Sequence, residues 1–185
     1  MEFAPMRRLE TERLVLRELR RKDIRDYYER LGSSEAVTRY MLWEPHREIS
    51  ESVASIEKAL RRYEQGACYR WAIALKMDDR LIGVIELLKF DEDRNTCSFA
   101  YMLGEKFWGR GYGTEALKAA LGFAFTQLQL DAVEADHFAE NEASGAVMRR
   151  CGMKYVLTQK EKYEKNGAKH DAPMYCITRN DWENS

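Results

Sequence analysis

Proline is scarce in this sequence, at three residues in 185, and no Pro/Gly/Ser-rich linker, internal repeat or low-complexity tract divides it. No apolar run approaches the roughly 20 residues that span a bilayer. The N-terminus also lacks the apolar core of a secretory signal peptide. We therefore expect a single domain over residues 1–185 that works in the cytoplasm without a membrane partner.

The sequence also lacks an excess of charge of either sign. Lys and Arg total 30 against 31 Asp and Glu, a net charge of −1, which excludes a chain-wide field that would attract nucleic acid or acidic membranes. No spacing of His, Cys, Asp and Glu suggests a metal site. The four cysteines form no C-x-x-C pair and lie in apolar segments, so we expect reduced core residues at Cys68, Cys97, Cys151 and Cys176.

The first third of the sequence predicts a strand followed by two helices. Residues 11–19 (TERLVLREL) alternate as a strand does, and the segment that follows starts a helix with Asp23 as its expected N-cap. A second helix is expected from Ser50, its cap, to the neighbourhood of Gly66. Its apolar positions recur at helical spacing, namely Val53, Ile56, Ala59, Leu60 and Tyr63.

The remainder alternates between sheet and helix. Residues 69–76 and 81–90 flank a polar turn and predict an antiparallel hairpin, with residues 95–103 as a third strand. An amphipathic helix follows a glycine-rich segment. A strand at 132–138 then leads through a short helix to two last strands, at 153–163 and 172–178.

The glycine-rich segment is WGRGYGT, from Trp108 to Thr114. Its three alternate glycines let the backbone approach a ligand, and the helix N-terminus adds partial positive charge, so the segment suits a pyrophosphate. Arg110 could add a phosphate contact. No Lys-Ser/Thr pair follows, as a Walker A motif needs, and the third glycine is one residue early for G-x-G-x-x-G. A purely structural turn that packs helix against strand is the alternative.

A second segment, AENEASGAVMRRCGMKY, begins a short helix at Asn141 and Ser144. Taken alone, this pattern is better explained as a capped helix, because Asn and Ser are favoured at helix N-termini for backbone reasons.

Together and in this order, FWGRGYGTEALKAALGFAF, VEADHF and NEASGAVMRRCGM resemble the GNAT superfamily of N-acetyltransferases. The branch they resemble includes the ribosomal-protein N-terminal acetyltransferases. Gly111 and Gly113 fit the superfamily motif Gln/Arg-x-x-Gly-x-Gly/Ala, whereas Trp108 replaces Gln or Arg, as is typical of this branch. The resemblance covers most of the chain. It implies an α/β (α+β) fold with a mostly antiparallel mixed sheet of about seven strands and about four helices on both faces.

The resemblance also implies the cosubstrate and the reaction. Acetyl-CoA would donate an acetyl group to a primary amine, either a protein N-terminal α-amine, as on ribosomal proteins, or a small-molecule amine, by direct attack in a ternary complex. No metal is implied, and a homodimer is expected. The residues expected to hold coenzyme A are Tyr101, Met102 and Leu103, which would pair with the pantetheine arm, with Trp108, Gly109, Arg110, Gly111, Tyr112, Gly113, Thr114 and Asn141.

The chain departs from the wider superfamily at one catalytic position. Many members carry a Tyr seven residues after the Asn, as the acid that protonates the leaving thiolate, and this chain has Met148 there. The resembling branch assigns that role to a Ser, which Ser144 matches.

An acceptor amine must lose a proton before it attacks, and the oxyanion needs a donor, such as the Met102 or Leu103 N–H. Glu86 is the first candidate base, because both faces of its strand are apolar and a buried carboxylate tends to take up a proton. The alternative is a Glu at the sheet rim paired with Arg or Lys. His137 is the second candidate, since an imidazole suits proton transfer near neutral pH. The alternative there is a hydrogen-bonded structural histidine.

Three questions stay open from the sequence. Tyr40, Trp43 and His46 either line the acceptor pocket or anchor a loop, and no role is assigned to them. A non-catalytic acyl-CoA-binding module is the rival function, because the usual Tyr is missing. A nucleic-acid-binding domain is disfavoured, since neither a basic face nor an aromatic-basic ribbon is visible.

Overall fold

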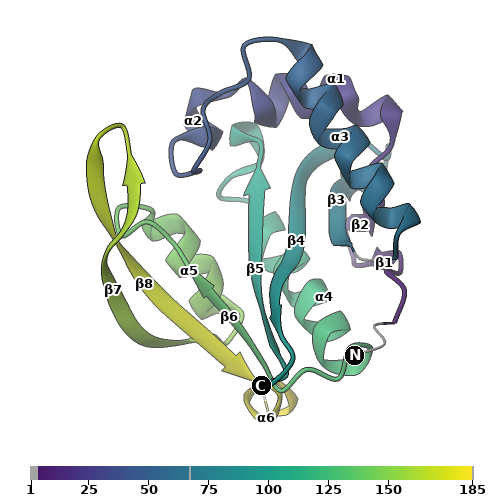
Figure 1. Cartoon of the computed structure of the whole chain (residues 1–185). Helices are drawn as coiled ribbons and strands as arrows, with labels where there is room; N and C mark the ends of the chain where they lie inside the picture. Colours follow the sequence, from purple (N-terminus) through teal and green to yellow (C-terminus); the bar gives the residue numbers. More distant parts are fainter. Residues whose placement is uncertain (1–3, 67, 185) are drawn as a thin grey trace.

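A twisted sheet runs through the centre of the molecule (Figure 1). The computed structural model describes residues 4–66 and 68–184. In this part of the chain the sheet has eight strands in the order β1-β2-β3-β4-β5-β6-β8-β7, and all neighbours are antiparallel except β5 and β6. The strands are β1 (Leu9–Glu10), β2 (Leu14–Arg17), β3 (Tyr69–Leu75), β4 (Leu81–Asp91), β5 (Thr96–Leu103), β6 (Ala132–Asp136), β7 (Lys154–Lys165) and β8 (Ala168–Thr178).

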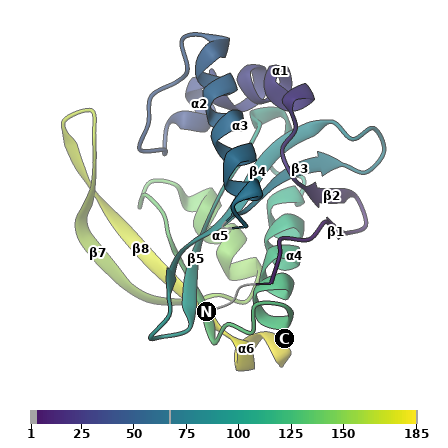
Figure 2. The same ribbon diagram turned by 45° about the vertical axis from the view of Figure 1, so that its right-hand side comes forward.

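Helices cover both faces of the sheet, as predicted. Helices α1 and α3 lie over one face and α4 and α5 over the other, which the turned view makes clear (Figure 2). Each face has its own apolar cluster, the α4 side being the larger. The α-helices of the described residues are α1 (Ile24–Tyr27), α2 (Glu35–Thr38), α3 (Ile49–Glu64), α4 (Tyr112–Thr126), α5 (Glu142–Arg150) and α6 (Arg179–Glu183).

The longest elements are those whose apolar spacing predicted them. The stripe on α4 is buried against the sheet, and the hairpin β3–β4 turns at the expected polar residues. The sequence missed the two-residue strand β1 and the short helices α2 and α6, which present too few residues for a period to be recognised.

One predicted cap is wrong, and the other has the predicted position without a capping hydrogen bond. Helix α3 begins at Ile49, and Ser50 lies inside it, because Glu48 and Glu51 form a reciprocal capping box. Asp23 occupies the N-cap position of α1, but its side chain accepts no hydrogen bond from the first turn of that helix. Its carboxylate accepts two hydrogen bonds from the buried Arg17 guanidinium, at 2.8 and 2.9 Å, and one from the Arg20 N–H. A buried arginine needs such a partner, and this requirement outweighs capping.

The sheet opens between β5 and β6. Their parallel ladder joins only residues 96–98 to residues 132–134, and the strands diverge beyond it (Figure 1). Past Ser98, the edge of β5 therefore has no strand beside it in the described structure. Helix α5 and the loop before α4 lie near this opening.

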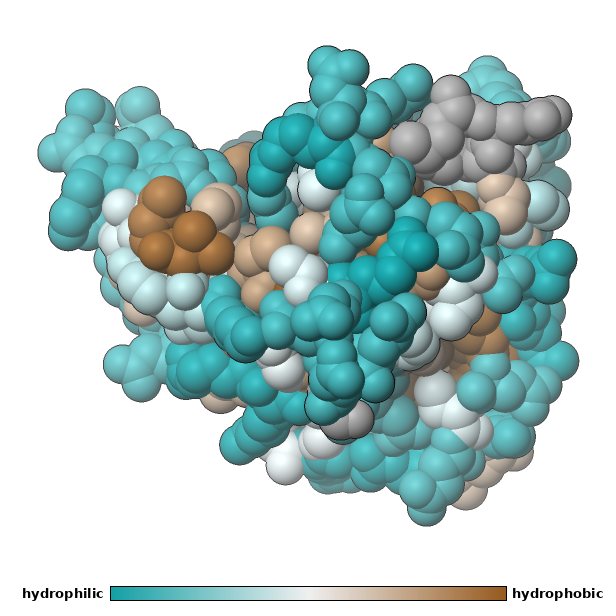
Figure 3. All heavy atoms as spheres, turned by 90° about the horizontal axis from the view of Figure 1, so that it is seen from below, coloured by the Kyte–Doolittle hydropathy of each residue, from teal (hydrophilic) through white to brown (hydrophobic). Residues whose placement is uncertain are grey.

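The far edge of the sheet is β7, which carries exposed apolar residues. Tyr155 is 57% exposed, Val156 47% and Leu157 44%. Seen from below, hydrophobic atoms gather on the side of the molecule where β7 and β8 lie, on an otherwise mostly hydrophilic face (Figure 3).

The four cysteines are free, and Cys68, Cys97 and Cys151 are buried while Cys176 is half-buried. Burial raises the pKa of Cys97 to about 12, so this thiol stays protonated. Among the described helices, none combines the length and the apolarity that crossing a bilayer would take.

Candidate active site

The glycine loop is open to a ligand through its backbone. Gly109 and Gly111 have φ of +71° and +82°, a left-handed conformation that favours glycine. Within the described residues, the N–H groups of residues 109–114 have no protein acceptor. Six free donors at the start of a 15-residue helix form the kind of cradle that binds phosphate groups.

A carboxylate in the first turn of α4 fixes this loop. Glu115 accepts hydrogen bonds from the Thr11 hydroxyl at 2.5 Å and from the Arg13 N–H at 2.9 Å. The Arg13 guanidinium in turn donates to the Arg110 carbonyl at 3.0 Å. Burial alone would raise the pKa of Glu115, but the hydrogen bonds from Thr11 and Arg13 outweigh it and lower that pKa. The loop is therefore tied to the turn before β2.

A cleft of about 420 Å³ lies between the glycine loop, the free edge of β5 and the start of α5, and we call it the glycine-loop cleft. It brings together most of the residues that the resemblance assigned to coenzyme A. Those that line it are Tyr101, Met102, Leu103, Trp108, Gly109, Gly111, Tyr112, Gly113, Thr114 and Asn141. Ser144, the predicted acid, lines it as well.

Arg110 lies just outside this cleft, in an adjoining open hollow that it shares with Lys118 and Arg150. Arg150 borders both hollows. Neither Lys118 nor Arg150 was predicted from the sequence, although Lys118 lies one helical turn after Thr114 and so faces the same way. The three cations add side-chain charge to the backbone cradle, next to the acids Glu12 and Glu115.

The backbone of β5 presents alternate residues to the cleft. Met102 is opposite Val84 on β4, and the Gly104 N–H donates to the Ile82 carbonyl at 2.9 Å. Because hydrogen-bonded pairs alternate in an antiparallel ladder, the amide of Met102 faces β4, and those of Tyr101 and Leu103 face the open edge. Of the two oxyanion donors predicted, only the Leu103 N–H can point into the cleft.

One contact accounts for the presence of Trp108 in the motif. Its indole N–H donates to the Leu103 carbonyl at 2.7 Å, and the residue is 47% exposed. The indole thus satisfies the last carbonyl of β5 and borders the cleft. A Gln or Arg side chain could donate at this position in the same way.

Two side chains with hydroxyl groups, Tyr101 and Ser144, line the cleft. Ser144 is 9% exposed. Burial raises the pKa of Tyr101, and the interaction with the Ser144 side chain partly opposes the rise. Asn141 is the N-cap of α5 and accepts from the Ser144 N–H. The capping interpretation of Asn141 is therefore correct, and it also borders the cleft. Only a backbone role was predicted for Tyr101 from the sequence.

A second cleft, of about 300 Å³, lies on the opposite face of the sheet, and we call it the Glu86 cleft. The two clefts share Met41, Tyr101 and Met102, so they meet at the middle of β5. Trp43 and His46 line the Glu86 cleft, and Tyr40 lines the glycine-loop cleft. Further residues of the Glu86 cleft are Tyr27, Ser55, Arg70, Val84 and Ala100.

Glu86 lies in the floor of this cleft, in the middle of β4 rather than at the sheet rim. Its surroundings are less apolar than the apolar residues along its strand suggested. Its carboxylate accepts a hydrogen bond from Arg62 of α3 at 2.7 Å and is 20% exposed. That hydrogen bond also raises the pKa of Arg62. Arg62 was outside the strand pattern, so only the fold could reveal this partner.

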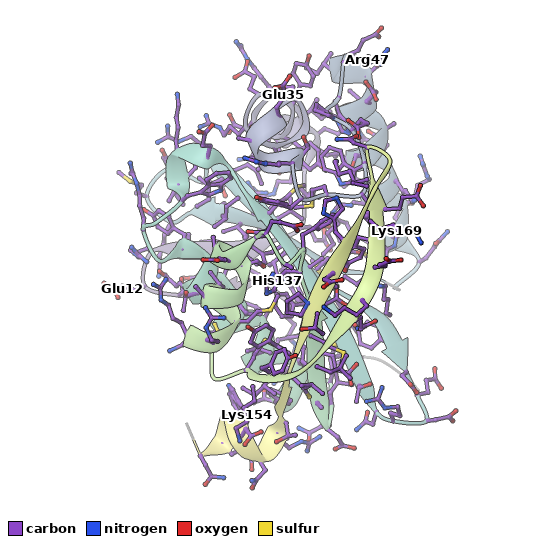
Figure 4. The ribbon with its side chains drawn as sticks, turned by 90° about the vertical axis from the view of Figure 1, so that its left-hand side faces the viewer. Glu12, Glu35, Arg47, His137, Lys154 and Lys169 are labelled. Atoms are coloured by element: carbon purple, nitrogen blue, oxygen red, sulfur yellow. The ribbon has the colours of Figure 1, made fainter. Side chains whose placement is uncertain are left out.

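The structure does not bring His137 to either cleft. Its ring stacks on Tyr175 of β8 at 5.7 Å, and Nδ1 is 2.7 Å from the Phe138 carbonyl. Nε2 is buried without a partner in the described residues and faces Gly145 of α5, where a Cβ would lie 2.7 Å away. Figure 4 shows His137 between α5 and the β7–β8 hairpin. This position corresponds to the structural alternative.

The tip of the β7–β8 hairpin holds the loop that lines both clefts. The Lys165 ammonium donates to the carbonyls of Thr38, Met41 and Trp43, at 3.1, 2.6 and 3.2 Å. The side chain is only 10% exposed. Three carbonyl partners compensate for burying the charge.

Comparison with known proteins places the chain in a family. The sequence profile of the GNAT acetyltransferase domain matches residues 13–154, and the chain belongs to this family of acetyltransferases. It is 25% identical to the uncharacterized N-acetyltransferase YoaA of Bacillus subtilis, covering 92% of this chain and 96% of the relative. It is 27% identical to the ribosomal protein uS5-alanine N-acetyltransferase of Escherichia coli, covering 96% and 94%.

Solved structures share the fold. The spermidine N-acetyltransferase of Vibrio cholerae, solved in complex with CoA and spermine, has a TM-score of 0.80 at 22% identity, covering 94% of this chain and all of that one. GNAT enzymes use acetyl-CoA, and the free N–H groups of residues 109–114 with the nearby cations suit its phosphates. The described residues contain no group of three or more His, Cys, Asp or Glu suited to a metal ion.

Proposed function

We propose that the chain transfers an acetyl group from acetyl-CoA to a primary amine by direct attack in a ternary complex. The observation that carries this proposal is the meeting of the two clefts at β5, through Met41, Tyr101 and Met102. A thioester held in the glycine-loop cleft and an amine in the Glu86 cleft would approach each other from opposite faces of the sheet. No cysteine is among the described residues that line either cleft, which favours direct attack over an acyl-enzyme.

The cleft residues have distinct roles in this proposal. Residues 109–114 bind the pyrophosphate through their N–H groups, and the free edge of β5 and Asn141 hold the pantetheine arm. As the amine nitrogen bonds to the carbonyl carbon, the Leu103 N–H stabilises the oxyanion. When the carbon–sulfur bond breaks, Ser144 gives a proton to the thiolate, and the Tyr101 phenol positions the Ser144 hydroxyl.

The amine proton goes to Glu86, directly or through water. Glu86 is preferred to His137 because it lines the acceptor side, whereas His137 is packed beneath α5. For Glu86 to act as a base, the Arg62 hydrogen bond must loosen or the carboxylate must use its other oxygen. A carboxylate has enough lone pairs to accept a proton while it remains paired.

We further propose that the chain acts in the cytoplasm and forms a homodimer. The support for a dimer is the exposed apolar run Tyr155, Val156 and Leu157 on β7, the edge strand of the sheet. A monomer mass by light scattering at micromolar concentration would contradict it.

The decisive experiment measures thiol release from acetyl-CoA with a panel of amines, with mass spectrometry of the acetylated product. Initial rates at varied concentrations of both substrates should give intersecting lines, as a ternary complex requires. Coenzyme binding by calorimetry is measured in parallel. Tight binding without release of thiol for any amine would instead support the non-catalytic acyl-CoA-binding module.

A further inference from the structure

Among the described residues, Arg70 in the floor of the Glu86 cleft has no carboxylate partner. It lies opposite Glu86 in the β3–β4 register, yet Glu86 pairs with Arg62 instead, at 2.7 Å. In the described structure the Arg70 Nε is buried and unpartnered, and the one hydrogen bond from its guanidinium goes to the Tyr27 hydroxyl at 3.1 Å. A guanidinium remains charged under all ordinary conditions, so it calls for an anionic partner.

The charges around this floor sum to a positive value. Among the described residues that line the cleft, Arg70 balances Glu86, and Arg62, which pairs with Glu86 from α3, adds one further positive charge. A polycation would meet net repulsion here, whereas an anion would pair with Arg70. The planar guanidinium fork matches a carboxylate in geometry as well as in charge.

From these contacts we infer that the acceptor is a small primary amine that also carries a carboxylate, as an amino acid does, and that Arg70 binds this carboxylate. The inference rests on the proposed function and narrows its acceptor. Arg70, Glu86 and Ala100 are consecutive neighbours in register, so Arg70 lies two strand spacings, about 10 Å, from β5. Such spacing fits an amine and a carboxylate separated by a few bonds.

The size and walls of the cleft favour a free small molecule over a protein chain. About 300 Å³ accommodates one amino acid. The walls include Tyr27, Met41 and Trp43, which would pack against an apolar side chain. The carboxylate would then supply most of the orientation, because Arg70 is the only unpaired charge among the described lining residues.

The test compares acceptors that differ only in the carboxylate: L-phenylalanine, L-phenylalaninamide and phenethylamine, with spermidine as the polycation. For the wild-type enzyme, kcat/KM should be about 10- to 100-fold higher with phenylalanine than with the other two aromatic amines. Arg70→Gln should abolish this preference and Arg70→Lys should keep part of it. Arg25→Gln, at an arginine 82% exposed on α1, is the matched control and should keep all of it.

Three outcomes would overturn the inference: equal rates with and without the carboxylate, a preference for spermidine, or a carboxylate preference that survives in folded Arg70→Gln. Faster turnover of a peptide N-terminus bearing Asp rather than Asn would also overturn it, by placing the carboxylate on a protein chain. Calorimetry of phenylalanine binding to the CoA-loaded protein separates the two proposals. Arg70-dependent binding without turnover would retain the inference and reject the proposed function.

Discussion

The two clefts are built in different ways. The glycine-loop cleft takes its donors from the backbone of one continuous segment, residues 108–114, at the start of α4. The Glu86 cleft takes its groups from side chains on α1, α3, β3, β4 and the loop before α3. A backbone site can be recognised in a sequence because it needs glycines at fixed spacing. A side-chain site depends on tertiary neighbours and can change its specificity without changing the fold.

The largest expected effect tests the backbone half of this comparison. Gly111→Glu forces a side chain into a φ of +82°, 3.3 Å from the Arg13 guanidinium, and puts negative charge in the anion cradle. Affinity for coenzyme A should fall by at least about 100-fold, because both the backbone shape and the charge oppose the phosphates. Calorimetry measures this loss.

Gly167→Glu is the control for strain and charge. Gly167 has a φ of +75° at the tip of the β7–β8 hairpin, with no atom near its Cβ position. This variant should bind coenzyme A as the wild type does. Unchanged affinity in a folded Gly111→Glu protein would remove the loop from the coenzyme site.

At the junction of the clefts, Ser144→Ala should lower kcat by about 10- to 10³-fold, because it removes the proposed acid for the thiolate while water can substitute in part. The dissociation constant of coenzyme A should change little. Tyr101→Phe should lower kcat by a smaller factor. Ser50→Ala, at an exposed serine in the first turn of α3, is the control. A fully active Ser144→Ala enzyme would leave Ser144 with a structural role only.

On the acceptor side, Glu86→Gln should lower kcat/KM by about 10- to 100-fold near neutral pH. The loss should shrink as the pH rises, because more of the acceptor amine is then already neutral. Arg62→Gln breaks the same ion pair but keeps the carboxylate, so it should retain the wild-type shape of the pH profile. If Glu86→Gln shows the wild-type rate and profile, the base is an ordered water chain or His137.

The smallest expected effect concerns the loop that borders both clefts. Lys165→Met removes three hydrogen bonds to carbonyls of residues 38–43, so the loop should move more freely. The KM for the acceptor should rise by about 3- to 10-fold, and the affinity for coenzyme A should change less. Lys169→Met, at a 61% exposed lysine of the same hairpin, should change neither. An equal weakening of acceptor binding and of coenzyme A binding would contradict the distinction between the clefts.

The sequence predicted the parts of the molecule that local rules determine. The α4 stripe, the β3–β4 hairpin and the glycine loop follow from spacing and turn chemistry over fewer than about 20 residues. The Ser50 cap failed for a local reason, since a capping box with Glu48 and Glu51 competed and prevailed.

The tertiary partners could not be predicted. Arg62 meets Glu86, Tyr101 meets Ser144 and Lys165 meets the 38–43 loop across sequence separations that carry no pattern. Glu86 therefore looked like an isolated carboxylate in an apolar strand. His137 had the strand phase expected of a cleft residue, but α5 packs over it through Gly145. Arg70 could not be predicted as a site residue, because one arginine among many has no distinguishing spacing.

The short parallel ladder between β5 and β6 has a mechanical consequence. In the described residues, three residue pairs join β1–β5 to β6–β8 within the sheet. This seam divides the sheet into two leaves, β1–β5 and β6–β8, and a molecule that contacts Leu103 on one leaf and Asn141 on the other would span it. Coenzyme binding would then raise the melting temperature of the chain as a whole by linking its two leaves. Amides at the seam would gain more protection from hydrogen exchange than amides in the outer strands.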